Sequence, residues 1–337
     1  MSFHRDVLKL DPKAETQRIV DRLRTDVLNV LKRGGGVLGV SGGIDSAVVL
    51  ALSVRAFGPE RVVALLLPER ESSPESALLG REVCRKFGVA AMVEDITGAL
   101  LGFDCYARRD EAIRSVFPEY DSTYKVKITL PEDLLDNETL NVFSVTVVSP
   151  EGEEQKKRLR PDLLRQIVAA SNFKQRCRAA MLYYHAELRN YAVIGTPPKN
   201  EQDMGFFVKY GDSAMDVKPI AHLYKTQVYQ LAEYLEIPET IQNRPPTTDT
   251  YSAGSTQEEF FFRLPFDVLD LLWYACEYEV PVSEVADETG LNEQQVQRAF
   301  NDFRRKVRTT EFLRTPPLGM DTSGEPADFG ASLTAVG

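Results

Sequence analysis

The sequence predicts an α/β fold, in which a doubly wound parallel sheet carries helices on both faces. Two sets of observations support this prediction. A short apolar run at 37–40 is followed by a turn of small residues at 41–46 and a helical pattern at 47–58, which is the order that opens a parallel α/β unit. Nearly continuous apolar runs at 61–68 and 191–196 are typical of strands that are covered on both faces.

The segments around these strands predict further helices and a strand. Residues 13–33 carry apolar side chains at helical spacing and end at three consecutive glycines. Residues 74–88 begin with proline, which favours the first position of a helix, and end with glycine. The apolar run at 89–96 predicts another strand. We expect the crossovers between parallel strands to be right-handed.

An inserted β-hairpin interrupts this α/β order within residues 120–160. Residues 124–130 and 141–148 alternate polar side chains with β-branched or aromatic ones, and an acidic turn lies between the two runs. Alternation of this kind is typical of antiparallel strands with one face against a core. The sequence therefore predicts an addition to the α/β core rather than a part of its parallel sheet.

The last part of the chain has a helical pattern. We expect an α/β domain at 1–264, a helical C-terminal region at 265–318 packed on it, and a flexible tail at 319–337. Residues 282–306 also fit a DNA-binding helix-turn-helix. That alternative is disfavoured because its basic residues stand at a helix C-terminus, where the macrodipole favours them, whereas recognition helices read bases with their N-terminal residues.

Composition excludes several classes of protein. The 337 residues are 43% hydrophobic and 27% charged, which indicates a globular chain. No run reaches the roughly 18 to 20 apolar residues of a membrane helix, and the start lacks the apolar core of a signal peptide, so we expect a cytoplasmic protein with no membrane contact. A net charge of −10 disfavours a nucleic-acid partner. The four scattered cysteines have neither metal-binding nor disulfide spacing.

The SGGIDS turn is suited to binding phosphate. Gly42 and Gly43 allow consecutive N–H groups to converge on an anion, and the helix that follows adds its positive end. Ser41 and Ser46 add hydroxyl groups, and Asp45 is placed to hold a divalent cation against the phosphate. The spacing alone is equally compatible with an ordinary strand-to-helix turn, and the lysine of a Walker A loop is absent.

Longer motifs point to a family. The string LGVSGGIDSAVVLAL resembles the loop of the ATP pyrophosphatase superfamily, whose members cut ATP between its α and β phosphates to adenylate a substrate. Residues 172–187, 191–235 and 244–249 resemble successive blocks of the ammonia-dependent NAD synthetases. The resemblance covers roughly 15–100 and 165–315 and implies an adenine nucleotide alpha hydrolase-like fold.

The resemblance implies a ligase of NAD biosynthesis. Such an enzyme uses ATP as co-substrate and Mg²⁺ as cofactor to join ammonia to deamido-NAD (nicotinic acid adenine dinucleotide) through an adenylate, and it releases NAD, AMP and pyrophosphate. Family members are usually homodimers. Two alternatives stay open: an amide ligase that acts on a different carboxylate, and a tRNA-modifying ATP pyrophosphatase, which would call for a basic appended domain.

The resemblance also assigns roles to individual residues. Asp45 and Glu201 match the Mg²⁺ ligands, and both follow strands at the carboxyl edge of the sheet, where their carboxylates can meet. Lys225 matches a lysine that contacts the ATP phosphates, and we expect it and Asp45 to be catalytic. The residues that match contacts of ATP are Gly39, Ser41, Gly42, Gly43, Ser46, Thr196 and Thr247. Those that match contacts of deamido-NAD are Arg176, Lys209 and Asp216.

The chain departs from the family pattern at two places near these residues. Pro197 and Pro198 stand where members commonly have small or polar residues. Phe312 and Leu313 stand where many members have a His-Lys pair that reaches the substrate of the partner subunit. The motifs therefore support ATP chemistry more strongly than they support deamido-NAD as the carboxylate.

No protein nucleophile is needed, because the carboxylate of the substrate attacks ATP. The histidines His4, His185 and His222 are expected to be packed or surface residues. Glu258 and Glu259, in an acidic loop like the one that covers the amidation site in the family, are candidates for accepting the proton of ammonia.

Overall fold

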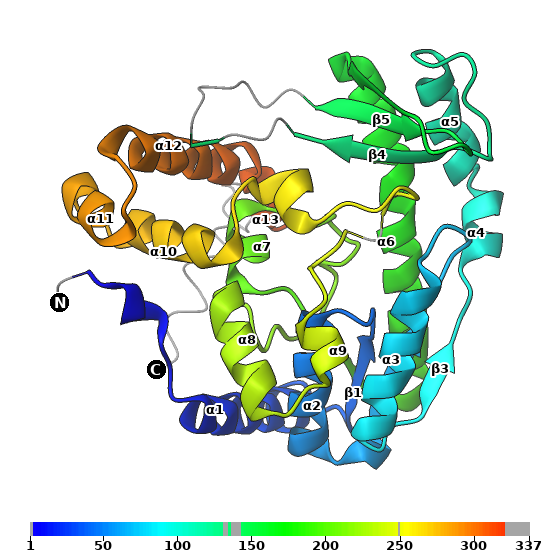
Figure 1. The fold of residues 1–337 in the computed structure, drawn as a ribbon. Helices are drawn as coiled ribbons and strands as arrows, with labels where there is room; N and C mark the ends of the chain where they lie inside the picture. The colour runs from blue at the N-terminus through cyan, green and yellow to red at the C-terminus, as the bar shows by residue number, and fades with distance from the viewer. Residues whose placement is uncertain (1–2, 131–133, 136–142, 249, 321–337) are drawn as a thin grey trace.

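The computed structural model describes residues 3–130, 134–135, 143–248 and 250–320. Its centre is a parallel sheet with the strand order β3-β2-β1-β7 (Figure 1). In this sheet Gly36 of β1 pairs with Val62 of β2 on one side and with Ala192 of β7 on the other. The strands of this sheet are β1 Gly36–Gly39, β2 Val62–Leu66, β3 Ala91–Val93 and β7 Ala192–Val193.

The helices surround this sheet and extend beyond it (Figure 1). In the first part of the chain they are η1 Arg5–Leu8, α1 Pro12–Arg24, η2 Thr25–Val30, α2 Ile44–Phe57, η3 Pro59–Arg61, α3 Pro74–Lys86, α4 Thr97–Gly102 and α5 Cys105–Arg114. In the second part they are α6 Pro161–Arg189, α7 Lys199–Met204, α8 Lys225–Tyr234, α9 Glu239–Gln242, η4 Glu258–Phe262, α10 Phe266–Glu277, α11 Val282–Thr289, α12 Glu293–Thr309 and α13 Glu311–Arg314. None of the described helices has the length and apolar content to cross a lipid bilayer.

Helices pack on both faces of the sheet, as predicted. Successive side chains of a strand point to opposite faces. Leu38 and Ala64 belong to the hydrophobic core that α2, α3 and α8 form on one face. The alternate residues Val37 and Leu65 pack with Ala186 of α6 on the other. The nearly continuous apolar strands of the sequence therefore follow from burial on two sides.

Some elements are shorter than the sequence predicts. The strand expected at 191–196 is reduced to β7, which ends at Val193. The chain then pairs with a different segment, because Ile194 forms a bridge with Val217 and the N–H of Gly195 donates to the carbonyl of Val217 at 2.9 Å. The single helix expected at 13–33 is divided, since α1 ends at Arg24 and the chain continues as the π-helix η2.

The insertion is a sheet of three strands, so the prediction of a hairpin is wrong in the number of strands. The pair β4 Lys125–Thr129 and β5 Ser144–Val148 is antiparallel, as predicted, but β6 Glu154–Arg158 extends the sheet beyond β5. All five residues of β6 are exposed. Because none of them is apolar, β6 has no hydrophobic alternation, and only pairing with β5 makes it a strand.

Helix α6 connects the two sheets. Its 29 residues span about 43 Å at 1.5 Å per residue. Figure 1 shows it running from the antiparallel sheet down to the parallel one. Its N-terminal half therefore lies near the insertion, and its C-terminal half packs on the parallel sheet.

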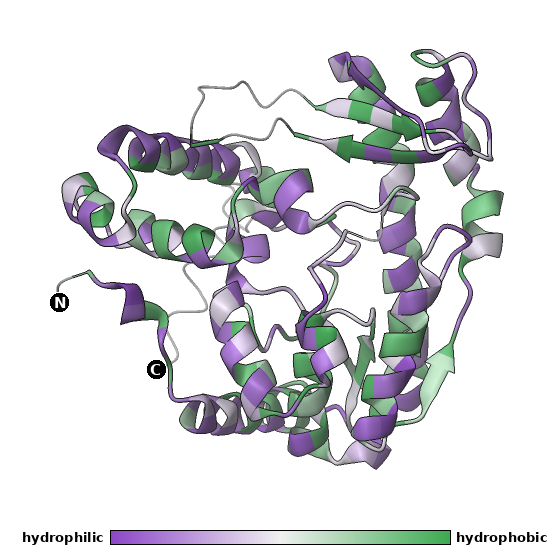
Figure 2. Cartoon of the chain, viewed as in Figure 1, coloured by the Kyte–Doolittle hydropathy of each residue, from purple (hydrophilic) through white to green (hydrophobic). Residues whose placement is uncertain are grey.

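The helices after residue 265 form a separate hydrophobic core together with the N-terminus. Phe3 and Leu8 pack in the same cluster as Leu272 of α10 and Phe303 of α12. Figure 2 shows α12 as largely hydrophilic in the view drawn, with its few apolar residues between polar ones. The division of the chain at residue 264 stays a prediction, and residues 321–337 of the expected tail lie outside the described residues.

Candidate active site

A cavity of about 660 Å³ lies at the carboxyl edge of the parallel sheet. The ends of three strands reach it through Gly39, Leu66 and Val193. Ligands of open α/β sheets bind at this edge, where the loops after neighbouring strands converge. The insertion contributes a wall as well, because Ile128 of β4 and Phe143 before β5 line the same cavity.

The SGGIDS turn forms one side of the cavity. Gly42 has a φ of +77°, and a Cβ atom there would lie 2.5 Å from the carbonyl oxygen of Ser76, so only glycine fits. The hydroxyl of Ser46 donates to the carbonyl of Gly43 at 2.9 Å and accepts from the N–H of Ser41 at 3.2 Å. The serines therefore hold the turn together while α2 begins at Ile44. The first N–H groups of that helix have no partner within it, which leaves them available to a ligand at this side of the cavity.

The structure brings Asp45, Lys225 and Glu201 to one part of the site, and the pairing of Lys225 with Asp45 is an addition to what the sequence predicts. Nζ of Lys225 donates to Oδ2 of Asp45 at 2.5 Å, and the lysine is fully buried. Asp45 and Glu201 both line the cavity. Burial raises the pKa of Glu201, and the nearby carboxylates of Asp45 and Asp212 raise it further, while Lys225 opposes them. The site thus holds more carboxylate than its one buried lysine can neutralise.

This excess of carboxylate fits a hard cation. Oδ1 of Asp45 is buried and has no hydrogen-bond partner, which leaves one oxygen open to a ligand. Among the residues that the structure describes, no cluster of three or more acidic, histidine or cysteine side chains is arranged for a metal. Mg²⁺ needs no such cluster, since it is usually bound by one or two carboxylates together with substrate phosphates and water. Asp45 and Glu201 are therefore suited to hold Mg²⁺ when a nucleotide is bound.

A buried carboxylate that the sequence analysis missed positions this group. Asp270 of α10 accepts from Nδ2 of Asn200 and from the N–H of Thr226, both at 2.7 Å. Oδ1 of Asn200 in turn accepts from the N–H of Lys225 at 3.1 Å. Burial raises the pKa of Asp270 to about 6. The available signal was an acid within the apolar stretch at 268–276, and its partners became visible only in the fold.

The other residues assigned to ATP lie at the same edge of the sheet. Thr196 follows β7, and Thr247 lies in the loop after α9. Lys225 and Gly42 do not line the cavity themselves. Lys225 contacts Asp45, which does line it. The assigned residues whose atoms line the cavity are Gly39, Ser41, Gly43, Asp45, Ser46, Thr196, Glu201 and Thr247.

The residues assigned to deamido-NAD lie outside the lining of the cavity. Nη2 of Arg176 donates to the carbonyl of Lys209 at 3.3 Å, and Nζ of Lys209 donates to the carbonyls of Phe312 and Thr315, both at 2.7 Å. Asp216 accepts from the N–H of Val193 at 2.7 Å. The structure therefore brings Arg176 and Lys209 together beside the C-terminal segment, and the role of all three stays a prediction.

Two arginines in the cavity were not assigned by the sequence analysis. Arg178 of α6 donates to the carbonyl of Leu67 at 3.2 Å, and Arg244 donates to the hydroxyl of Ser76 at 3.0 Å. Both line the cavity, which gives it fixed positive charge despite the acidic total of the chain. Phe312 also lines it, at one of the positions where the chain departs from the family pattern.

The candidate proton acceptors Glu258 and Glu259 do not line the cavity, although Gln257 does. Oε1 of Glu258 accepts from the N–H of Phe266 at 3.1 Å, and Oε2 of Glu259 accepts from the N–H of Thr256 at 3.2 Å. Both carboxylates therefore hold backbone groups in this structure.

The histidines lie away from the cavity, as expected. Nε2 of His185 lies 2.9 Å from Glu94, and Nε2 of His222 lies 2.7 Å from Glu15. His4 is exposed. Among the described residues, no histidine lines the cavity.

Comparisons with known proteins agree with this geometry. A family model described as NAD synthase matches residues 15–117 and 124–317. The protein named NH(3)-dependent NAD(+) synthetase from Mesorhizobium japonicum is 49% identical over 312 residues, which cover 93% of this chain and 98% of that protein. The protein of the same name from Rhizobium meliloti is 49% identical over 315 residues, or 94% of each chain.

Solved structures share the fold. The NH3-dependent NAD synthetase from Campylobacter jejuni, in complex with the nitrate ion, matches 93% of this chain and 100% of its own with a TM-score of 0.59 and 23% identity. The NMN synthetase from Francisella tularensis matches the same shares with a TM-score of 0.58 and 21% identity. At these identities the likeness concerns the fold alone, and it confirms the predicted fold class. The family match and the high identity of the relatives together show that the chain belongs to the NAD synthase family.

Proposed function

We propose that the protein catalyses the ATP- and Mg²⁺-dependent amidation of deamido-NAD with ammonia, which yields NAD, AMP and pyrophosphate. The observation that carries the proposal is the group formed by the buried Lys225 and the cavity-lining carboxylates of Asp45 and Glu201 beside the SGGIDS turn. Relatives with 49% identity over nearly the whole chain are named NH(3)-dependent NAD(+) synthetase, which supports this choice of reaction.

The first step is adenylation. A carboxylate oxygen of deamido-NAD attacks the α-phosphorus of ATP, and the bond to the β-phosphate oxygen breaks to release pyrophosphate. The N–H groups at the start of α2 and the ammonium group of Lys225 stabilise the negative charge of the phosphates. Mg²⁺ held by Asp45 and Glu201 would neutralise further phosphate charge. Arg178 and Arg244 supply fixed cations on two other walls of the cavity.

The second step is amidation. Ammonia attacks the carbonyl carbon of the adenylate, the carbon–oxygen bond to AMP breaks, and the nitrogen loses a proton to give the neutral amide. Neither step forms a bond to the protein, so its contribution is to position the reactants and stabilise charge. The four cysteines are free and buried, which agrees with a reaction that uses no thiol nucleophile.

The acid substrate is proposed to lie across the edge of the cavity, between two copies of the chain. Arg176 and Asp216 are exposed, and Lys209 is anchored to the segment before Thr315. A dinucleotide held by these residues would extend from the cavity onto the surface, where a partner subunit can cover it. Light scattering on the purified protein tests the homodimer, and a monomer at assay concentrations would contradict it.

The reaction is tested by supplying ATP, Mg²⁺, ammonia and one candidate acid, and by measuring AMP and the amide. We expect AMP and NAD in equal amounts with deamido-NAD, and loss of both when EDTA removes the metal. Nicotinic acid mononucleotide is the matched competitor, because the fold is shared with an NMN synthetase. Faster turnover of the mononucleotide would overturn the substrate, and AMP without amide would overturn the amidation.

A further inference from the structure

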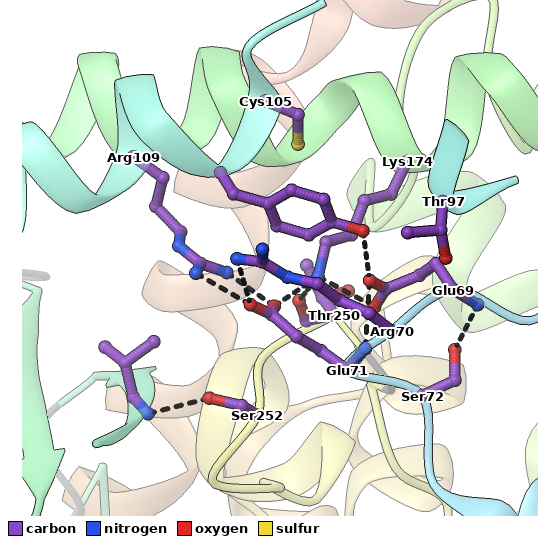
Figure 3. Close-up of polar contacts among 12 residues, drawn as sticks. Glu69, Arg70, Glu71, Ser72, Thr97, Cys105, Arg109, Lys174, Thr250 and Ser252 are labelled. Atoms are coloured by element: carbon purple, nitrogen blue, oxygen red, sulfur yellow. Dashed lines mark hydrogen bonds and ion pairs between the residues drawn. The ribbon is translucent and has the colours of Figure 1, made fainter. Parts of the chain in front are cut away.

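A cluster of buried charges lies beside the cavity, apart from the residues that the proposed reaction uses (Figure 3). Nζ of Lys174 in α6 donates to Oε1 of Glu69 at 3.0 Å, to Oε2 of Glu71 at 2.8 Å and to the carbonyl oxygen of Thr250 at 2.9 Å. Arg109 of α5 donates two hydrogen bonds to Glu71, at 2.6 and 2.8 Å. Because an ammonium group has three N–H donors, every donor of Lys174 has a partner.

The centre of the cluster is closed to water, its charges balance, and of its six side chains Arg70 is the exposed one, at 39%. The side chains of Lys174 and Arg109 are 1% and 2% exposed. Burial raises the pKa of Glu71, but the hydrogen bonds from Arg109 and the charge of Lys174 outweigh it and lower the pKa to about 2. The three carboxylates of the cluster are Glu69, Glu71 and Asp110, and its three cations are Arg70, Arg109 and Lys174.

The cost of desolvating such charges offsets most of their attraction, so a buried cluster adds little net stability. An apolar side chain of similar volume in place of Lys174 could fill the same space. What an apolar side chain could not do is bond to three acceptors from two separate loops. The feature specific to Lys174 is therefore the fixed arrangement of the two loops that supply its three acceptors.

Both of those loops continue into the wall of the cavity. The hydroxyl of Ser72 accepts from the N–H of Glu69 at 3.1 Å, and Ser72 lines the cavity. On the other loop, Thr250 lines the cavity, and its hydroxyl donates to the carbonyl of Thr248 at 2.9 Å. Thr248 adjoins Thr247, which is assigned to ATP. The ammonium group thus joins two lining segments that come from distant parts of the chain.

We propose that Lys174 is a positioning residue of the ATP subsite: it holds the Glu69–Ser72 loop at a fixed separation from the lining residues Thr247, Thr248 and Thr250. The inference rests on the proposed function, because Thr247 and the SGGIDS turn belong to one subsite only if the ligand of the cavity is ATP. Lys174 itself does not line the cavity, so its effect on ATP passes through the loops that it joins.

Two variants keep the charge of the cluster balanced and remove the three-way contact of Lys174; the side-chain oxygen of a glutamine at position 69 can still accept from the hydroxyl of Tyr106. Lys174→Met combined with Glu69→Gln removes one charge of each sign. Lys174→Arg keeps the positive charge, but a planar guanidinium cannot direct its donors as an ammonium group does. For both we expect melting temperatures near that of the wild type, a KM for ATP and a Kd for ATP raised about tenfold, and a KM for deamido-NAD within about twofold, since small misplacements of binding groups have effects of this size or larger.

The matched control is His185→Gln, further along the same helix. His185 is also buried and polar, and it bonds to Glu94 and Arg189, away from the cavity. This variant should lower the melting temperature and leave the KM for ATP within about twofold of the wild type.

ATP affinity measured by calorimetry separates the outcomes. Wild-type affinity in both Lys174 variants would overturn the positioning role and leave the proposed function intact. An equal rise in KM for the His185 control would also overturn it, because the effect would then report general destabilisation. Wild-type protein that binds no ATP would overturn the proposed function and this inference together. Faster hydrogen exchange at residues 69–73, 247–248 and 250–251, restricted to the Lys174 variants, is the further expected result.

Discussion

Asp270→Ala should weaken both the fold and the reaction, because one buried carboxylate supports two functional helices. Asp270 accepts from the side chain of Asn200 in α7 and from the N–H of Thr226 in α8, and both donors lie 2.7 Å away. Asp270 and Asn200 are fully buried. Alanine removes both acceptors and leaves no water-exposed route by which the two donors could be satisfied.

The magnitude follows from those two donors. A buried donor without a partner costs about 1–3 kcal/mol, so the loss should be about 2–6 kcal/mol, out of a typical free energy of unfolding of about 5–15 kcal/mol. The reaction should also slow, because Asn200 accepts from the N–H of Lys225 at 3.1 Å and thereby fixes the position of the lysine relative to Asp45. Asp270→Asn keeps one acceptor and should lose about half as much stability.

Urea denaturation gives the free energy of unfolding, and steady-state AMP release gives kcat for the variants that remain folded. The matched control is Asp267→Ala, which removes an exposed carboxylate from the first turn of the same helix. It should change stability by no more than about 1 kcal/mol. A free energy for Asp270→Ala within 1 kcal/mol of wild type would refute the argument, since it would mean that Asn200 and Thr226 do not depend on this carboxylate.

Four other predictions concern the site and its surroundings. Asp45→Ala should retain the wild-type circular dichroism spectrum and lose AMP formation, and residual turnover above a few per cent would contradict its role as a ligand. The raised pKa of Glu201 means that Mg²⁺ must displace a proton, so calorimetry in the presence of ATP should show affinity rising with pH in the wild type, and a flat profile would count against this carboxylate. The pKa of Glu71, lowered from 4.5 to about 2, contributes stability above pH 4.5 that is lost as the pH falls toward 2, so the difference in urea stability between wild type and Glu71→Gln should shrink over that range, and a constant difference would be inconsistent with it. Cys177→Ser should keep nearly full activity, because burial raises the pKa of this thiol and no step uses it, whereas an inactive variant would reveal covalent chemistry.

Part of the site was predictable because its residues stand at places that local sequence defines. Asp45 follows a strand and a glycine turn, and Glu201 follows another strand, so the topology of a parallel sheet brings them to one edge. Lys225 was assigned from motif resemblance, and the structure places it against Asp45. Each of these residues was found from a pattern that spans only a few neighbours in the chain.

The residues that were missed have partners far away in the sequence. Asp270 has no visible partner in the apolar stretch of its helix until α7 and α8 meet it. Arg178 was given no role, because helical spacing does not reveal which charged face meets a cavity. The strand β6 has no apolar residue and exists only through its hydrogen bonds to β5.

The amino-acid sequence by itself determined the α/β class, the glycine turn after the first strand and the family, since strand burial, glycine conformation and motif order act over short stretches of chain. Only the tertiary structure decided which charges are buried together, how Lys174 ties two loops, and how the insertion becomes a wall of the cavity. The physical reason is that the free energy of a buried charge depends on the groups that folding brings within a few ångströms of it. Those groups can lie far away along the chain, so local sequence patterns do not reveal them.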